Sequence, residues 1–363
     1  MSSLLHLAAA VDQPGTPDAA TCAELALLAE RGGLDFVTLG DSFTRPVPDA
    51  LGVLSRLAPA TRRIGLVPTV TSADGESLQV RAAVAALDRV SRGRAGWRTE
   101  VPATEEESRL CGRPPAAPPE TPWREAGGIA GAAAGPGDGS QDGAEVRGGV
   151  RDAVTGRFPN RDRPHHVGFT RTGSPVRAPS TVPRPPQGHP VRVGDATDDH
   201  ALTVAARYAD VALVRAADPA RAAGLRDRLR ERARAAGRDP DTLRILVSLL
   251  VDLGDGECAA RPGHGGGGPR PTARGPLYRG GPVDLAELVT AWHADGVTDG
   301  FHLIPVEPRR DLERLVNGTV ALLQHRGLFR TFYPGSTLRE HLGLGRPAHR
   351  CAVLTDHRRH PAP

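Results

Sequence analysis

The sequence predicts an α/β protein folded as a (β/α)8 TIM barrel with long irregular insertions. Short apolar, β-rich runs alternate with segments of helical spacing along the 363 residues, and this alternation indicates parallel strands covered by helices. Eight strand candidates occur, which is the number found in this barrel. A doubly wound open sheet is the alternative, but residues 13–17 after the first strand read QPGTP and lack the GxGxxG fingerprint of that fold.

Each predicted strand is a short run of apolar and β-branched residues. The runs LDFVTL at Leu34–Leu39 and RIGLVPTV at Arg63–Val70 are typical, because both are too short for a stable helix and rich in β-forming side chains. The other predicted strands are Leu4–Val11, Arg94–Arg98, Pro190–Val193, Val211–Val214, Leu243–Leu253 and Gly300–Ile304.

Segments with helical spacing follow most of these strands. Glu76–Ser91 carries a continuous apolar stripe, which predicts a helix packed on the sheet. Pro219–Gly237 is rich in Arg with Asp and Glu between, which is typical of a solvated helix on the outside of a barrel. The other predicted helices are Asp18–Gly32, Asp49–Ala58, Asp198–Tyr208, Leu285–Asp295 and Asp311–Gly327.

The alternation is interrupted by stretches that offer no continuous apolar face. Between residues 102 and 145 the large apolar side chains are Leu110, Trp123 and Ile129, and residues 254–281 are rich in Gly, Pro and Arg. Such segments bury too little surface to offset the entropy of ordering. We therefore expect one barrel domain over residues 1–344, with loop-like or disordered insertions at 102–150 and 254–282 and a disordered tail at 345–363.

The composition excludes several classes of protein. All 46 residues counted as Lys or Arg are arginine, which excludes a P-loop and Schiff-base chemistry on a lysine. The four cysteines are scattered, which argues against a disulfide framework or a zinc site. Acids and bases are interleaved, so the net charge of +4 is no signal for nucleic acid. Without an apolar run of ~18 residues or a signal peptide, we expect a cytoplasmic protein with no membrane partner.

The candidate site consists of the residues that close the predicted strands, because the active site of such a barrel lies at the C-terminal ends of its strands. They are Asp41, Ser42, Thr69, Thr71, Ser72, Trp97, Arg98, Thr197, Asp198 and His302. Each also has a structural interpretation. Thr197 and Asp198 sit where a helix would be capped, and His302 between apolar neighbours is more often a core histidine with satisfied hydrogen bonds. No residue is assigned to catalysis or to a metal.

Several strings, in order and spacing, resemble the flavin-dependent luciferase-like monooxygenases, and most closely the branch that includes nitrilotriacetate monooxygenase. The most specific are "GRAGW" at 93–97, "PRPPQG" at 183–188 and the string RGLFRTFYPGSTLREHLGL at Arg326–Leu344. The others are AERGGLDFVTLGDS (Ala29–Ser42), RRIGLVPTVTS (Arg62–Ser72), ALDRVSRGRAGWR (Ala86–Arg98), VTGRF (Val154–Phe158), AARYADVAL (Ala205–Leu213) and DGFHLIPV (Asp299–Val306).

The resemblance implies a barrel that binds reduced FMN at its C-terminal end and uses O2 to oxygenate a small organic substrate. A separate flavin reductase supplies the reduced FMN to such enzymes. The cofactor carries the difficult chemistry, and the protein contributes positioning and water exclusion. Members of the family are often homodimers or homotetramers.

The resemblance also places cofactor contacts on residues of this chain: Asp41, Thr71, Ser72, Trp97, Arg98, Trp123, Thr197 and Asp198. Asp41 matches the acidic residue near the flavin ring, and Thr71 or Ser72 matches the hydroxyl residue that ends the third strand. Trp97 matches the Trp of the "GRAGW" string, and Arg98 stands where many members have Asn. Trp123 falls where a Tyr often contacts the flavin, and Thr197 and Asp198 fall in the turn that holds the FMN phosphate.

The chain departs from the family pattern near the expected cofactor site. TSADGESLQ at Thr71–Gln79 lacks the aromatic or histidine positions of the family, and the phosphate turn carries acids, which oppose a dianion. Residues 124–145 are rich in Gly, Ala and Pro where the family has a helix. Two alternatives therefore stand beside the monooxygenase: a decayed, non-catalytic barrel and a deazaflavin-dependent hydride-transfer oxidoreductase. A frameshift within 102–150 and 255–282 is one hypothesis for the composition.

Overall fold

The computed structural model describes the strands and helices of the barrel together with part of its connecting segments. The described residues are 5–12, 18–40, 49–71, 77–101, 105–110, 123, 166–171, 174–179, 185–254 and 268–347.

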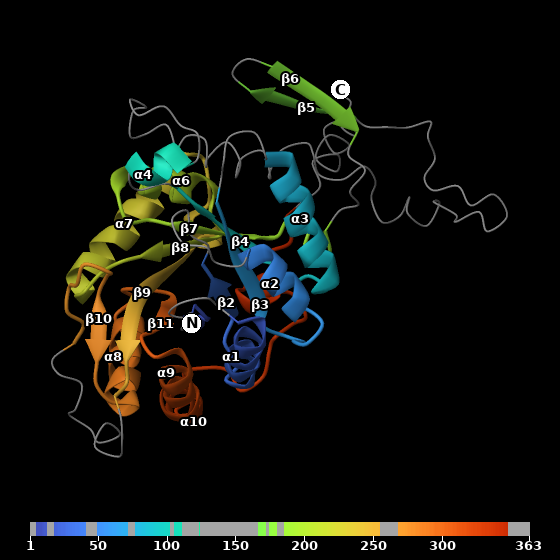
Figure 1. The fold of residues 1–363 in the computed structure, drawn as a ribbon. Helices are drawn as coiled ribbons and strands as arrows, with labels where there is room; N and C mark the ends of the chain where they lie inside the picture. The colour runs from blue at the N-terminus through green and yellow to red at the C-terminus, as the bar shows by residue number, and fades with distance from the viewer. Residues whose placement is uncertain are drawn as a thin grey trace, which may run out of the picture.

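Eight parallel strands close into a barrel, which confirms the predicted fold (Figure 1). Around the barrel the order is β9-β11-β1-β2-β3-β4-β7-β8, and β8 pairs with β9 to complete the ring. The strands are β1 (His6–Ala10), β2 (Phe36–Leu39), β3 (Gly65–Thr71), β4 (Gly96–Glu100), β7 (Val191–Asp195), β8 (Val211–Val214), β9 (Arg244–Asp252) and β11 (Gly300–Pro305). Each coincides with one of the predicted strands to within a few residues.

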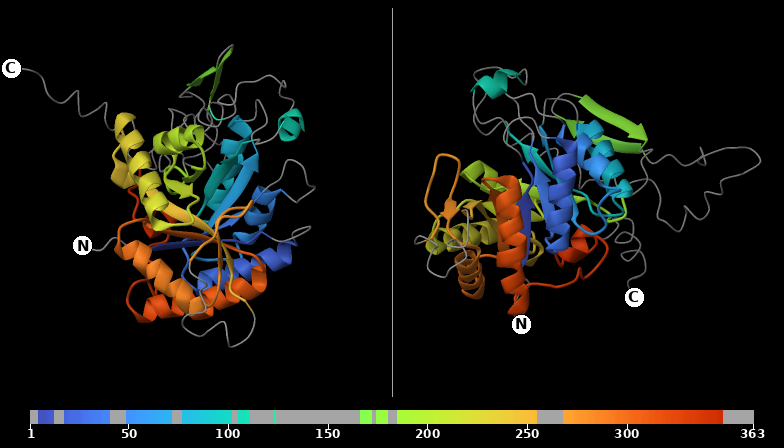
Figure 2. Two further views of the ribbon diagram at one scale, coloured as in Figure 1. Left: turned by 90° about the vertical axis from the view of Figure 1, so that its left-hand side faces the viewer. Right: turned by 60° about the horizontal axis from the view of Figure 1, so that its bottom comes forward.

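Helices cover the outside of this ring, as Figure 2 shows. They are α1 (Ala19–Arg31), α2 (Ala50–Leu57), α3 (Ser77–Val90), α6 (Asp199–Tyr208), α7 (Pro219–Ala235), α8 (Pro282–Ala294), α9 (Pro308–Arg314) and α10 (Ala321–His325). Asp18, Asp49, Asp198 and Asp218 cap the helices that follow them through side-chain bonds to backbone N–H groups. A π-helical turn at Leu315–Val320 joins α9 to α10, so the segment predicted as one helix is continuous but not uniform.

The strands bury a different set of side chains on each face. One apolar cluster lies between the strands and the helices and contains Leu7, Val37 and Leu66. A second cluster fills the inside of the barrel and contains Ala8, Phe36 and Val67. Along β1, β2 and β3, a residue of the outer cluster is followed or preceded by a residue of the interior cluster, as expected from the two-residue period of a strand. Every second residue of a strand therefore faces the interior of the barrel.

A short C-terminal helix, α11 (Leu338–His341), closes the N-terminal end of the barrel. Leu338 and Leu342 are fully buried within the interior cluster. The backbone N–H of Arg339 donates to Gln187 Oε1 at 3.0 Å, and Gln187 Nε2 donates to Asp88 Oδ1 at 2.5 Å. Segments of the strings "PRPPQG", ALDRV and TLREHLGL therefore meet at this end, opposite to the ends of the strands where the site is expected.

Some residues of the predicted irregular insertions form regular structure. The prediction is wrong at β10 (Leu277–Arg279), which pairs with β9 as an additional strand because the Tyr278 side chain is 1% exposed and its hydroxyl donates to Gly281 O at 3.1 Å. It is also wrong at α4 (Glu105–Leu110), which is a short helix. Outside these two insertions, β5 (His166–Arg171) and β6 (Ser174–Pro179) pair as an antiparallel hairpin. Residues 111–122, 124–150, 255–267 and 348–363 lie outside the described part of the chain.

Candidate functional site

Thr69 of β3 and Arg98 of β4 face the interior of the barrel at the C-terminal ends of the strands, which we call the mouth. They are direct neighbours in the parallel register of β3 and β4. Two residues earlier on each strand, Val67 belongs to the interior cluster, and a Cβ on Gly96 would lie 2.9 Å from Val67 Cγ2. Because side chains alternate along a strand, Thr69 and Arg98 point the same way, into the barrel.

The Thr69 hydroxyl is buried without a hydrogen-bond partner. The residue is 1% exposed, and its Oγ1 contacts no donor or acceptor in the described structure. An unsatisfied buried hydroxyl costs about 1–3 kcal/mol, so native structures rarely keep one without a use. Beside it, Arg98 is half-buried and has no ion pair with the described residues.

Three polar side chains form a layer across the barrel below the mouth, which we call the polar floor: Thr38, Ser248 and His302. His302 Nε2 lies 2.9 Å from Thr38 Oγ1, and His302 Nδ1 lies 2.8 Å from Ser248 Oγ. A neutral imidazole has one N–H and one lone pair, so one hydroxyl donates to the ring and the other accepts from it. His302 is therefore a buried histidine with both nitrogens satisfied, as its structural interpretation predicts.

Burial and nearby charge keep His302 neutral. Burial, together with the positive charges of Arg98 and Arg215, lowers the pKa of His302 to about 3. At the opposite end of the barrel, burial lowers the pKa of His341 to about 4, with Arg330 acting in the same direction. Both side chains are thus neutral imidazoles in the folded protein across the ordinary pH range.

We expect the protein to lose stability as the pH falls below about 6.5, because the unfolded chain then takes up protons that the folded chain refuses. Each buried histidine contributes about 1.4 kcal/mol per pH unit while only its unfolded form is protonated. The measurement is the free energy of unfolding between pH 7.5 and pH 5 for the wild type and His302→Asn. The variant should show the shallower slope; equal slopes would contradict the assignment. Burial raises the pKa of Asp88, and this carboxyl therefore makes the folded protein more stable as the pH falls. Because Asp88 is present in both proteins, the difference between their slopes reports on His302.

At the rim of the mouth, Asp195 at the end of β7 connects to the next strand. Its Oδ2 lies 3.3 Å from Nη2 of Arg215, which follows β8, and its Oδ1 accepts the Thr197 hydroxyl. Asp195 shares the inward face of β7 with Val193 of the interior cluster. The rim thus holds a matched pair of charges, whereas Arg98 is matched by no described carboxylate within ion-pair distance.

The turn expected to hold a phosphate is occupied by its own side chains. Asp198 Oδ1 accepts from the backbone N–H groups of His200 and Ala201 at 2.9 and 2.8 Å. These N–H groups belong to the first turn of α6, which is where a phosphate would bind. Thr197 and Asp198 are both exposed. A phosphate at this position has to displace the Asp198 carboxylate or bind beside it.

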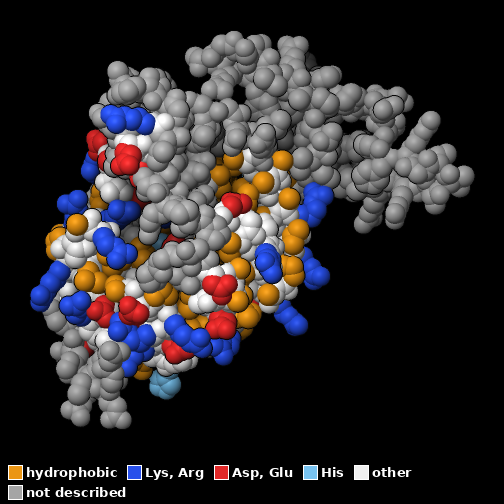
Figure 3. Space-filling view, in the orientation of Figure 1, with side chains coloured by type: hydrophobic (Ala, Val, Ile, Leu, Met, Phe, Trp, Pro, Cys, Tyr) orange, Lys and Arg blue, Asp and Glu red, His pale blue; other side chains and the backbone are white. Residues whose placement is uncertain are grey.

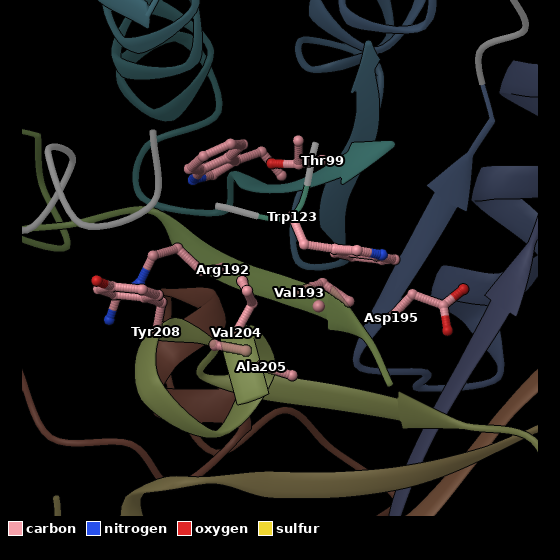
Figure 4. Close-up of a pocket in the computed structure, with 11 residues that line it drawn as sticks. Thr99, Trp123, Arg192, Val193, Asp195, Val204, Ala205 and Tyr208 are labelled. Carbon is pink, nitrogen blue, oxygen red and sulfur yellow. The ribbon is translucent and has the colours of Figure 1, made fainter. Parts of the chain in front are cut away.

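Trp97 lies on the other face of β4 from Arg98 and lines a separate pocket. The residue is 5% exposed and, with Trp123, Arg192 and Tyr208, surrounds a cavity between β4, β7 and α6. In Figure 4, Arg192 and Tyr208 lie at one end of this pocket and Asp195 at the other. The structure thus brings the candidates Trp97 and Trp123 together but separates them from Arg98 and Thr69, because neighbouring residues of a strand point in opposite directions.

Other candidates have no described side chain. Asp41, Ser42 and Ser72 lie outside the described residues, and Thr71 is placed only as the last residue of β3. Sequence reasoning did not select Thr38, Asp195, Arg215 or Ser248. Counting alternate positions back from the end of each strand could have found Thr38, Asp195 and Ser248.

No metal site or membrane span occurs in the part of the chain that the structure describes. Its His, Cys, Asp and Glu residues form no group of three placed to hold an ion, and no described helix is long and apolar enough to cross a membrane. On the face in Figure 3, acidic and basic side chains are intermixed over the described surface.

Comparison with known proteins identifies relatives over most of the chain. A family model described as luciferase-like monooxygenase matches residues 1–124 and 150–303. Nitrilotriacetate monooxygenase component A of Aminobacter aminovorans is 27% identical over 410 residues, with 90% of each chain covered. N-acetyl-S-(2-succino)cysteine monooxygenase of Bacillus subtilis (strain 168) is 26% identical, covering 91% of this chain and 90% of that protein. The crystal structure of a long-chain alkane monooxygenase, LadA, has a TM-score of 0.79 at 18% identity over 94% of this chain and 96% of that one.

Proposed function

Because the chain belongs to the luciferase-like monooxygenase family, we propose that it is an FMN-dependent monooxygenase that transfers one oxygen atom from O2 to a small organic substrate. We propose further that a separate flavin reductase supplies the reduced FMN, since one relative is named as component A of its enzyme. The observation that carries the proposal is the unpartnered Thr69 hydroxyl beside Arg98 in the mouth of the barrel.

The described residues of the mouth fit the polar edge of a flavin ring. Such an edge carries carbonyl and ring-nitrogen acceptors, and Thr69 and Arg98 offer donors that no described acceptor uses. The polar floor beneath them is uncharged, because His302 is a neutral imidazole and both of its ring nitrogens are already bonded. The flavin, when bound, supplies the reaction with O2, and the protein holds the ring and keeps bulk water away.

Other cofactor contacts remain part of the proposal. Asp41 follows β2, Thr71 ends β3 and Ser72 comes directly after it, so their positions in the sequence suit contacts to the ring. Thr197 and Asp198 are proposed at the phosphate, and Trp97 with Trp123 at the wall between β4 and α6. Homodimers or homotetramers and a cytoplasmic location are also proposed from the family.

The test is a fluorescence titration with oxidised and with reduced FMN, followed by O2 consumption when a flavin reductase and NADH are added. The proposal expects micromolar binding of reduced FMN and O2 uptake that depends on the reductase. Binding of a deazaflavin without O2 dependence would support hydride transfer instead. Absence of flavin binding in both redox states would overturn the proposal.

A non-catalytic barrel is the second candidate, and one observation favours it. Asp198 places its carboxylate on the N–H groups of α6 that a phosphate would use. If this cap excludes FMN, Asp198→Ser should gain flavin affinity at least tenfold, because a serine caps the helix without negative charge. If FMN already binds the wild type, the same change should have little effect.

A further inference from the structure

The wall of the barrel is taller on one side, where β10 extends it. β8 pairs with the first half of β9, at Arg244–Val247, and β10 pairs with the second half, at Leu250–Asp252 (Figure 1). β11 pairs along the other edge of β9, so β10 continues the line of β8 toward the mouth. In ring order, β9 and β11 lie opposite β3 and β4. The raised section, formed by Leu250–Asp252, β10 and the end of β11, therefore faces Thr69 and Arg98 across the mouth, and we call it the upper wall.

The inner face of the upper wall carries a row of apolar side chains from three strands. Leu250 is the register partner of Leu277 on β10 and of Ile304 on β11. It lies two residues beyond Ser248 of the polar floor, so the three side chains point into the barrel, one layer above that floor. Leu277 and Ile304 are partly exposed although they lie on strands. This row is therefore a surface on which the apolar part of a ligand can lie.

One guanidinium borders the apolar row. Arg215 directly follows β8, and a Cβ on Gly275 would lie 3.8 Å from Arg215 Cδ and 4.0 Å from Leu250 Cδ1. In the described structure the guanidinium has one acceptor, Asp195 Oδ2 at 3.3 Å, and the side chain is 43% exposed. Its charge reaches the polar floor, because it helps to lower the pKa of His302. Most of the five N–H donors of Arg215 are therefore open to a ligand that enters the mouth.

The acidic side chains near the apolar row are already bonded. Asp252, one layer above the row, is held by Arg279 at 2.9 Å and by Arg310 at 2.6 Å. Asp12, which follows β1, accepts the Gly40 N–H at 2.6 Å. Because two arginines bond to Asp252, this layer carries no net negative charge that would repel an anion.

We propose that the upper wall selects the substrate, and that the substrate is an amphiphilic organic anion, an apolar chain or ring that ends in a carboxylate. The chain or ring lies on Leu250, Leu277 and Ile304, and the carboxylate binds the Arg215 guanidinium, whose planar fork matches it. The inference rests on the proposed function, because it places the substrate between this wall and the flavin on the opposite side of the mouth. Neutral molecules leave Arg215 without an anion, and short acids leave the apolar row uncovered.

The experiment measures the binding of butyrate, hexanoate, octanoate and 1-octanol by anaerobic isothermal titration calorimetry, with and without reduced FMN. The affinity of the acids should rise about fourfold for each added methylene that contacts the wall. Octanoate should bind about tenfold or more tightly than 1-octanol, which has the same chain without the charge. Arg215→Met should remove this preference and leave the affinity for 1-octanol unchanged.

Variants of Leu277 test the apolar row separately. Leu277→Asn should reduce the gain in affinity with chain length and leave butyrate binding unchanged. Leu277→Ala, which removes apolar area without adding a polar group, should give the same ordering if Leu277→Asn proves unstable. Arg221→Met on α7 and Leu27→Asn on α1 make matched changes at exposed positions away from the mouth and should alter no affinity by more than twofold.

The outcomes separate this inference from the proposed function. If the wild type binds no flavin in either redox state but prefers octanoate, and Arg215→Met loses that preference, the proposed function fails and the substrate class stands. If flavin binds and O2 is consumed but octanoate and 1-octanol bind equally, or octanoate does not bind, the inference is overturned. An unchanged octanoate affinity in an Arg215→Met variant that is folded by circular dichroism overturns it as well.

Discussion

Arg94→Met should lower the free energy of unfolding by about 3–5 kcal/mol, because it leaves several buried acceptors without their donor, at a cost of about 1–3 kcal/mol for each unsatisfied group. Arg94 is 3% exposed and lies just before β4, near the closed end of the barrel. Its guanidinium donates to Ser91 O at 2.7 Å, Ile64 O at 2.7 Å and Ala58 O at 2.9 Å. It also donates to the hydroxyl and the carbonyl of Thr61 at 2.9 and 3.1 Å. Methionine would fill part of the space but leave these acceptors without a donor.

Urea denaturation followed by circular dichroism measures this loss, and two further variants make it specific. Arg94→Lys should recover only a small part, because an ammonium cannot reach the acceptors that the planar guanidinium reaches. Arg62→Met, at an exposed neighbouring arginine, should stay within about 0.5 kcal/mol of the wild type. A loss for Arg94→Met no larger than that of the Arg62 control would show that the buried bonds contribute little.

Arg94 also shows which part of the fold could be predicted from sequence. The strand that it precedes was predictable, because RAGWR and the other runs carry the apolar pattern of a buried strand. The role of Arg94 was not predictable, because most of its partners are backbone carbonyls. A backbone carbonyl is present in every residue, so neither residue type nor sequence spacing shows which ones the guanidinium reaches. β10 was missed for a related reason: Leu277 and Tyr278 are two large apolar residues in an otherwise Gly- and Pro-rich stretch, and the burial of Tyr278 depends on β9.

The candidate site was predictable in part. The rule that sites lie at strand ends selected Thr69, Arg98 and His302, and the structure brings all of them to the inside of the barrel. Trp97 was grouped with Arg98 because the residues are adjacent in the string, although adjacent strand residues face opposite ways. The bonds between His302, Thr38 and Ser248 join β11, β2 and β9, and only the closed barrel determines which side chains meet across its interior.

Asp35→Asn should also lower the free energy of unfolding by about 3–5 kcal/mol, because it leaves the largely buried Arg330 without its counter-charge. Asp35 is fully buried. Its Oδ1 accepts from Arg330 Nη1 at 2.8 Å and lies 3.3 Å from His6 Nδ1, and its Oδ2 accepts from the Leu7 N–H at 2.8 Å. Burial acts to raise the pKa of Asp35, but the charges of Arg330 and His6 outweigh it and hold the pKa below its ordinary value.

The pH dependence of this loss identifies the charge as its cause. A carboxyl whose pKa is lower in the folded than in the unfolded protein contributes stability above its unfolded pKa of about 3.9 and loses it as the pH falls through the folded value. The difference between wild type and Asp35→Asn should therefore be full at pH 7 and shrink below about pH 4. Asp227→Asn, at an exposed aspartate of α7, should show no difference at either pH.

Arg330→Met combined with Asp35→Asn should cost less than the sum of the two single changes, because the double variant leaves neither charge buried alone. Strict additivity would mean that the residues stabilise the closed end of the barrel independently, through their bonds to Leu7 and Gly33, and not as an ion pair.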